Sequence, residues 1–129
     1  MQNRQFGRIM RTFNVTRMRS SSSLWQPPVD IYESDAELIV FVDVAGIAPE
    51  RIKLMAEAEM LTITGERKCE ITGVTHVHRL EIEYGQFACR IPLPLPIDVD
   101  HTRSEIKDGF LVVRLPIVRR QGSVEINFK

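Results

Sequence analysis

The stretch AELIVFVDV, at residues 36–44, decides the fold class of this chain. Its apolar side chains recur at every second position from Leu38 to Val44, and such side chains lie on one face of an extended chain. The longest unbroken apolar run, residues 38–42, is far shorter than the ~20 residues that a membrane-spanning helix needs. We therefore predict a half-buried β-strand over residues 36–44.

The same period of two continues on the C-terminal side of this strand. It marks residues 51–56, 60–66, 79–84, 87–93 and 110–115 as further strands. Asp108-Gly109 introduces the last of them and is a strong hairpin signal, because both residue types tolerate a positive φ. About seven or eight short strands, with almost no helical period between them, favour a sandwich or barrel and exclude alternating βαβ units. The sequence therefore predicts an all-β fold.

Composition divides the chain into three parts. Residues 20–23 are a run of serines, which is typical of a flexible stretch, and the following Pro27-Pro28 excludes a helix. We predict a mobile N-terminal arm over residues 1–24 and a β-sandwich domain over residues 25–118. Residues 119–129 are predicted to form a C-terminal extension with a flexible start.

The N-terminal arm has a helical spacing of apolar residues. Phe6, Ile9, Met10 and Phe13 follow the i, i+3, i+4, i+7 pattern of a short amphipathic helix. Such a helix could pack on its own domain. The serine run favours the other interpretation, a mobile segment whose apolar residues bind exposed apolar patches on unfolding proteins.

Charge is distributed unevenly along the chain. Residues 1–24 carry five arginines and no acidic residue, whereas residues 25–118 carry sixteen acidic and nine basic side chains. An acidic body repels nucleic acid and anionic lipid, so we expect no nucleic-acid partner and no stable membrane insertion. Only Cys69 and Cys89 could form a disulfide, which suits a reducing compartment, and the expected location is the cytoplasm. An arginine- and serine-rich start is also typical of an organelle transit peptide, and this alternative stays open.

The sequence offers no catalytic, cofactor-binding or metal-binding residues. It lacks the glycine-rich loop ending in Gly-Lys-Ser/Thr that holds nucleotide phosphates. Cys69, His76 and His78 do not have the spacing of a closed zinc site, and we interpret them as solvated loop residues. Alternation turns Cys89 to the same face as Phe87, which predicts a buried, inert thiol. We therefore expect a protein that is not an enzyme and needs no cofactor.

Several segments of the body resemble one known family in order and spacing. They are PVDIYE at 28–33, VDVAGI at 42–47, LTITGER at 61–67, YGQF at 84–87, IPLP at 91–94 and SEIKDGFL at 104–111. Each is a weak signal alone, but together and in register they resemble the small heat-shock protein family of the bacterial type. The resemblance extends from Pro27 to Ile126.

The resemblance implies an immunoglobulin-like β-sandwich, the α-crystallin domain, and an ATP-independent holdase chaperone. Such a protein binds unfolding client proteins and prevents their aggregation under stress. The resemblance also implies a homo-oligomer built from strand-exchanged dimers, in which residues 67–78 form the dimerisation loop and Ile71, Val74 and Val77 are its apolar residues. A β-sandwich co-chaperone or scaffold module that binds one folded partner is the alternative.

Two details distinguish this chain within the resemblance. Its C-terminal motif is Val124-Glu125-Ile126, where relatives commonly have Ile-x-Ile. The resemblance implies that Val124 and Ile126 dock on a neighbouring subunit, since side chains two residues apart in a strand point the same way. Cys89 stands where many bacterial members carry an arginine, so a charge pair across the dimer at this position is not carried over.

Overall fold

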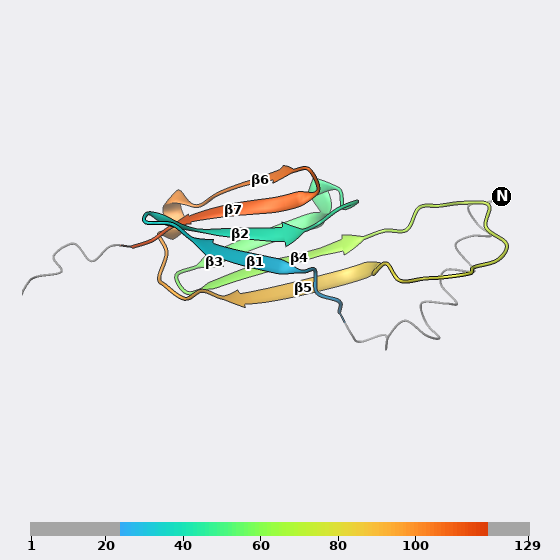
Figure 1. Cartoon of the computed structure of the whole chain (residues 1–129), viewed down its shortest axis with the longest axis horizontal. Coiled ribbons are helices and arrows are strands. Elements are labelled where there is room, and N and C mark those ends of the chain that lie inside the picture. Colours follow the sequence, from blue (N-terminus) through green and yellow to red (C-terminus); the bar gives the residue numbers. More distant parts are fainter. Residues whose placement is uncertain (1–23, 119–129) are drawn as a thin grey trace, which may run out of the picture. The chain divides into compact units, whose positions relative to one another are not determined.

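The computed structural model describes residues 24–118 of the chain, and strands make up most of its regular structure (Figure 1). The elements, in chain order, are β1 (Val29–Glu33), β2 (Glu37–Asp43), the 3-10 helix η2 (Pro49–Arg51), β3 (Ile52–Glu57), β4 (Met60–Arg67), β5 (Gly85–Pro92), the 3-10 helix η3 (Val99–His101), β6 (Arg103–Lys107) and β7 (Phe110–Pro116). The predicted all-β class is therefore confirmed. Within residues 24–118, no helix is long and apolar enough to cross a membrane.

The strands form two antiparallel sheets. One has the strand order β1-β2-β7-β6, and the other has the order β3-β4-β5. The register of β2 and β7 pairs Leu38 with Leu115 and Val40 with Val113, and all four side chains are completely buried. Because residues directly opposite each other in an antiparallel pair share a face, the period of two that is visible in residues 36–44 produces a continuous apolar layer across these strands.

The hairpin between β6 and β7 is the one that the sequence predicts. Lys107 pairs with Phe110, which leaves Asp108 and Gly109 as a two-residue turn. Their φ angles are 53° and 85°, in the left-handed region that this kind of tight hairpin turn needs at both positions.

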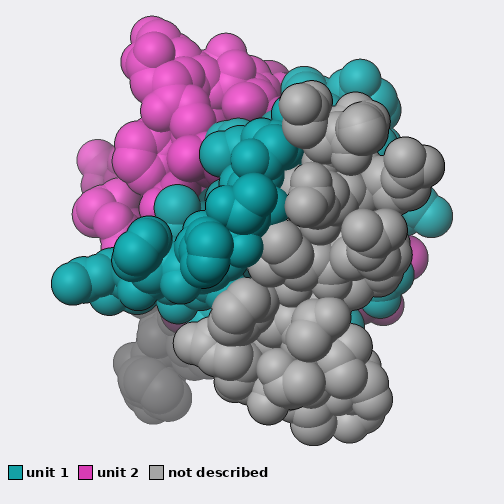
Figure 2. All heavy atoms as spheres, turned by 90° about the vertical axis from the view of Figure 1, so that its right-hand side faces the viewer, with its two compact units in different colours: residues 1–27, 46–54, 63–89 teal, residues 28–45, 55–62, 90–129 magenta. Residues whose placement is uncertain are grey.

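Two compact units make up the chain, and each is assembled from three segments (Figure 2). In the described chain, one unit contains residues 24–27, 46–54 and 63–89, and the other contains residues 28–45, 55–62 and 90–118. The buried apolar side chains of the first unit are Trp25, Ile47, Ile63, Phe87 and Cys89. Those of the second unit are Leu38, Val40, Val42, Val44, Leu61, Ile91, Leu93, Ile97, Leu111, Val112, Val113 and Leu115.

One predicted strand is wrong. Residues 79–84 alternate in sequence, but they belong to a loop between β4 and β5, residues 68–84, that contains no strand. Ile82, expected on an apolar face there, is exposed. A strand requires a neighbour that satisfies its backbone N–H and C=O groups, and in the described single chain no segment pairs with this one.

The prediction also missed two strands, β1 and β6. Both lie at the ends of the four-stranded sheet, and nearly all of their residues are exposed. Edge strands with little burial on either face do not need alternating hydrophobicity, so the period of two does not find them.

Candidate functional site

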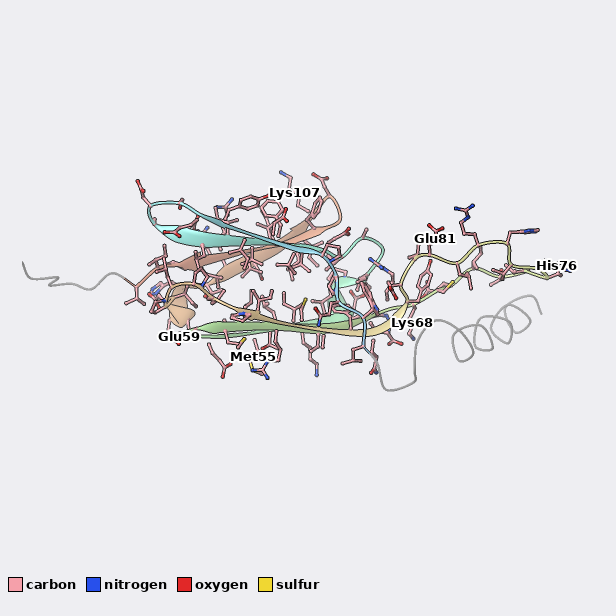
Figure 3. The ribbon with its side chains drawn as sticks, turned by 60° about the horizontal axis from the view of Figure 1, so that its bottom comes forward. Met55, Glu59, Lys68, His76, Glu81 and Lys107 are labelled. Carbon is pink, nitrogen blue, oxygen red and sulfur yellow. The ribbon has the colours of Figure 1, made fainter. Side chains whose placement is uncertain are left out.

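The three apolar residues predicted in the dimerisation loop lie together in the structure. Ile71, Val74 and Val77 all line one hollow of about 290 Å³, formed by the loop between β4 and β5, which we call the β4–β5 loop (residues 68–84). Ile71 is 57% exposed, while Val74 and Val77 are half-buried. The loop extends away from its strands, with Lys68 at its start and His76 near its far end (Figure 3). Apolar side chains are therefore presented to solvent on a long projecting segment.

The other predicted site residues lie outside the part of the chain that the structure describes. These are the docking residues Val124 and Ile126 and the arm residues Phe6, Ile9, Met10 and Phe13.

The base of the β4–β5 loop is held by Arg67, the last residue of β4. Its guanidinium Nη1 donates a hydrogen bond of 2.9 Å to the carbonyl oxygen of Glu83, so the two ends of the loop are joined directly. The same guanidinium lies over the Trp25 ring, with Cζ 4.6 Å from the ring centroid, a distance at which cation–π attraction is favourable. Next to it, burial and then the Cys69 thiol raise the pKa of Tyr84, so its hydroxyl stays protonated.

Trp25 attaches the segment before β1 to the free edge of β5. Its backbone forms a parallel bridge with Phe87, through Trp25 N–H to the Gln86 carbonyl at 3.4 Å and Ala88 N–H to the Trp25 carbonyl at 3.2 Å. The indole Nε1–H donates to the Gly85 carbonyl at 2.9 Å, and the side chain is only 6% exposed. We call Trp25, Arg67, Gly85 and Phe87 the loop-root cluster.

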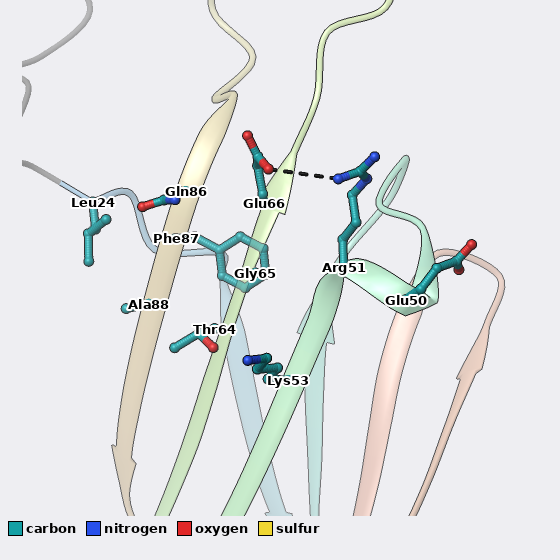
Figure 4. A pocket seen from close by; sticks show the side chains of 10 residues that line it. All are labelled: Leu24, Glu50, Arg51, Lys53, Thr64, Gly65, Glu66, Gln86, Phe87 and Ala88. Carbon is teal, nitrogen blue, oxygen red and sulfur yellow. Dashed lines mark ion pairs between the residues drawn. The ribbon is translucent and has the colours of Figure 1, made fainter.

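The Phe87 ring lies against Gly65 of β4 (Figure 4). A methyl group added at Gly65 would be 2.5 Å from the Arg51 carbonyl oxygen and 2.6 Å from Cζ of Phe87. Only a residue without a side chain leaves space for this ring. Gly65 and Phe87 also line a hollow of about 420 Å³, at whose rim Arg51 and Glu66 form an ion pair of 3.8 Å. The ring in turn packs on Trp25, with centroids 5.1 Å apart and planes tilted by 57°.

Three aromatic rings form a row on the exposed face of the four-stranded sheet. Tyr32 packs against Phe41 and Phe41 against Phe110, with ring centroids 5.8 Å apart in each pair. Tyr32 and Phe110 are both exposed. We call these three residues the aromatic row. Antiparallel sheets usually present polar residues on the face that is not packed on a core, so this apolar row is a candidate binding surface.

The edges of the four-stranded sheet are open in the described chain. Within residues 24–118, β1 and β6 each have a hydrogen-bonded neighbour on one side only. β1 also presents an exposed Ile31. An unpaired strand edge is a template for addition of a strand from another chain.

A charged cluster on the four-stranded sheet was not predicted from the sequence. The Glu37 carboxylate accepts hydrogen bonds from Arg114 Nη1 at 2.7 Å and from Arg103 Nη2 at 3.2 Å. Glu37 is only 18% exposed in its side chain. The three residues are far apart in sequence, and only the pairing of β2, β7 and β6 brings them together, so no spacing rule could have found them.

The thiols and imidazoles do not assemble into a reactive site. Cys89 is buried and burial raises the pKa of its thiol, which keeps it in the unreactive protonated form. Cys69 is half-buried, whereas His76 and His78 are exposed on the β4–β5 loop. In the part of the chain that the structure describes, no three or more His, Cys, Asp or Glu side chains are grouped so as to hold a metal ion.

Comparison with known proteins gives consistent matches. The family model described as Hsp20/alpha crystallin family matches residues 30–127. Over 97 residues the chain is 30% identical to small heat shock protein C4 of Rickettsia felis, an alignment that covers 74% of this chain. The chain spans 60% of the length of that relative.

Solved structures match the fold as well. The chain is similar to the structure of a small heat-shock protein from Xylella fastidiosa, with 31% identity and a TM-score of 0.68, covering 83% of this chain and 99% of that one. It is also similar to the structure of hspA from Xanthomonas axonopodis, with 34% identity and a TM-score of 0.65, covering 74% of this chain and 96% of that one. The predicted β-sandwich of the α-crystallin type is confirmed.

Proposed function

The chain belongs to the Hsp20/alpha crystallin family, and from that membership we propose that it is a holdase chaperone that acts without ATP. It binds proteins that unfold under stress, prevents their aggregation and assembles into homo-oligomers. The observation that carries the proposal is the match of the family model to residues 30–127, which include nearly all of the described strands.

Exposed apolar surface supports capture of unfolded chains. The aromatic row presents Tyr32 and Phe110 to solvent. Apolar groups at the surface gain free energy when an apolar segment of another protein covers them, by about 25 cal/mol for each Å² removed from water. Capture of this kind requires no bond making or breaking, so the chain acts by binding and not as an enzyme. Both described cysteines are free, which supports a reducing location such as the cytoplasm.

Capture is tested by size-exclusion chromatography after heating a heat-labile enzyme with the full chain in nucleotide-free buffer. We expect the unfolded enzyme to elute together with the chain as a soluble complex. Serum albumin in place of the chain is the control for non-specific protection. An enzyme that precipitates equally in both samples would refute the proposal.

Dimerisation by strand exchange is the finer part of the proposal. The β4–β5 loop of one subunit pairs with the open edge of β1 in its partner, which supplies the neighbouring strand that residues 68–84 do not have in the single chain. The exposed Ile31 on β1 and the exposed Ile71 and Ile82 on the loop are apolar residues that such pairing would bury.

Deletion of residues 71–77 tests this assignment. We expect monomers whose far-UV circular dichroism retains the signal of the sheets, because the deleted residues contribute to no strand in the described chain. Replacement of the same residues by a glycine–serine linker of equal length is the matched control for loop shortening, and it should also be monomeric. Either variant dimerising with native affinity would contradict strand exchange.

Val124 and Ile126 are proposed to hold dimers together in the oligomer by docking on a neighbouring subunit. Burying two such side chains contributes roughly 3–6 kcal/mol, and the entropy lost by the ordered tail offsets a large part of it, so the contact is weak and reversible. The test is Val124→Ala with Ile126→Ala, sized by light scattering. We expect species near dimer mass, while Glu125→Ala should keep the native size, because alternate side chains of an extended segment point in opposite directions. An unchanged large oligomer in the double variant would rule out docking.

The arm residues Phe6, Ile9, Met10 and Phe13 are proposed to bind clients together with the body. Serine at all four positions removes the apolar stripe and keeps the arginines. We expect a lower amount of captured client at equal chain concentration, with unchanged circular dichroism. Undiminished capture would show that the arm is not required.

A further inference from the structure

Three segments of the first unit that are distant in sequence meet at Trp25. They are residues 24–27 before β1, the end of β4 at Arg67 and the start of β5 at Gly85. Trp25 contacts the last two through its side chain, since the indole N–H bonds Gly85 and the ring faces the Arg67 guanidinium. Gly85 and Arg67 flank the β4–β5 loop on its two sides.

The Arg67 guanidinium has two functions at this point. It lies over the Trp25 ring at 4.6 Å, and it donates the 2.9 Å hydrogen bond to Glu83 that closes the base of the loop. Arginine is suited to both contacts, because its planar group stacks on aromatic rings while its edge donates hydrogen bonds. A guanidinium held over the indole ring is therefore already in position to bond Glu83.

We propose that the loop-root cluster couples the attachment of Trp25 on β5 to dimerisation: Trp25 orients Arg67, Arg67 fixes the base of the β4–β5 loop, and the fixed loop binds the partner subunit. Coupling between two sites is reciprocal, so partner binding in turn holds Trp25 on the edge of β5. When dimers dissociate, Trp25 loses this support and becomes freer to leave β5. The inference rests on the strand-exchanged dimer proposed above.

The size of the effect follows from the ring contact. A cation–π contact at a partly exposed site is worth a factor of about 2 to 5 in an equilibrium constant. A symmetric dimer contains the contact twice, and the single chain contains it as well, so its loss should weaken dimerisation by up to about 30-fold.

The first test compares Trp25→Leu with Met55→Ala, which shortens an apolar side chain at an exposed position of β3. Dimer affinity is measured by sedimentation of the full chain over a dilution series. We expect weaker dimerisation for Trp25→Leu, by up to about 30-fold, and native affinity for Met55→Ala. If Trp25→Leu does not fold, Arg67→Lys replaces it, because lysine keeps the charge but loses the planar contact with the ring.

A second test uses the intact chain, whose only tryptophan is Trp25, so its fluorescence reports on the cluster directly. We expect acrylamide quenching to rise as the dimer dissociates on dilution, while circular dichroism stays constant. Quenching that rises only with global unfolding would overturn the coupling.

The tests separate the two proposals. Monomers from the deletion of residues 71–77 together with native affinity in Trp25→Leu would overturn the coupling alone. A deletion variant that still dimerises would refute strand exchange itself.

Discussion

Replacing Gly65 with alanine should destabilise the fold through lack of space. The new methyl group would lie 2.5 Å from the Arg51 carbonyl oxygen and 2.6 Å from Cζ of Phe87, where ordinary contact needs about 3.5 Å. A backbone oxygen cannot rotate away as the end of a side chain can. Phe87 is only 1% exposed and its ring packs on Trp25, so moving the ring would disturb that contact.

The magnitude follows from these contacts. Forcing one extra methyl group into a well-packed site costs typically about 1–3 kcal/mol, and here two contacts must relax by roughly 1 Å each. We therefore expect a loss near the upper end, about 2–3 kcal/mol of unfolding free energy. With a urea dependence of about 1–2 kcal/mol per molar for a chain of this size, the unfolding midpoint should fall by roughly 1–3 M.

Urea unfolding followed by circular dichroism measures this shift, at one fixed protein concentration because assembly also contributes to stability. Gly46→Ala is the control. Gly46 has a φ of 77° and no atom within 4 Å of an added methyl group, so its cost is conformational, about 1 kcal/mol. Phe87→Leu should also lower the free energy of unfolding less in a chain that already carries Gly65→Ala than in the native chain. A Gly65→Ala midpoint equal to that of the native chain would refute the packing argument.

Two further predictions concern charge and thiol chemistry. Glu37→Ala should lower the free energy of unfolding in urea by about 1–3 kcal/mol, because it leaves two guanidinium groups without their carboxylate. Arg103→Ala, at an exposed position, should lower it by less than about 1 kcal/mol, and equal losses for the two variants would contradict this prediction. Cys69 should react with a thiol reagent in the folded chain and Cys89 only after unfolding, as mass spectrometry of the labelled chain would reveal. Burial raises the pKa of the Cys89 thiol in the folded chain, so the folded state favours the protonated thiol. The stability that this thiol contributes is complete below its unfolded-state pKa of about 8.5 and declines as the pH rises through its higher folded-state pKa. Cys89→Ala should reduce this loss of stability at high pH. Rapid labelling of Cys89 in the folded chain would show that its thiol is not buried.

The strands that the sequence predicts correctly are those with one buried face. Alternation in residues 36–44 corresponds to β2, whose buried positions Leu38, Val40 and Val42 face the apolar positions of β7. The turn at Asp108-Gly109 was predictable because it needs two positive φ angles that few residue types adopt.

The features that sequence reasoning missed depend on contacts between distant parts of the chain. β1 and β6 are exposed on both faces and have no hydrophobic period to detect. Residues 79–84 do have the period of two but no strand neighbour in the described chain. From the sequence, Trp25 only marks the start of the predicted domain, because its partners Arg67 and Gly85 are distant from it along the chain.

The family resemblance found in sequence motifs is consistent with the structural findings. The motif LTITGER contains both Gly65, which leaves space for Phe87, and Arg67, which joins the ends of the β4–β5 loop. Gly85 in YGQF accepts the indole hydrogen bond of Trp25. Those motifs thus include residues of the loop-root cluster as well as residues of the apolar core.

The most direct test of the central claim, that the chain captures unfolding proteins without ATP, is suppression of light scattering. A heat-labile enzyme is heated with increasing amounts of the full chain in buffer treated with apyrase to remove nucleotides. We predict that scattering falls steadily and is nearly abolished close to a one-to-one subunit ratio, for several unrelated enzymes. Scattering that is unchanged at that ratio, or that falls only when ATP is added, would contradict the account.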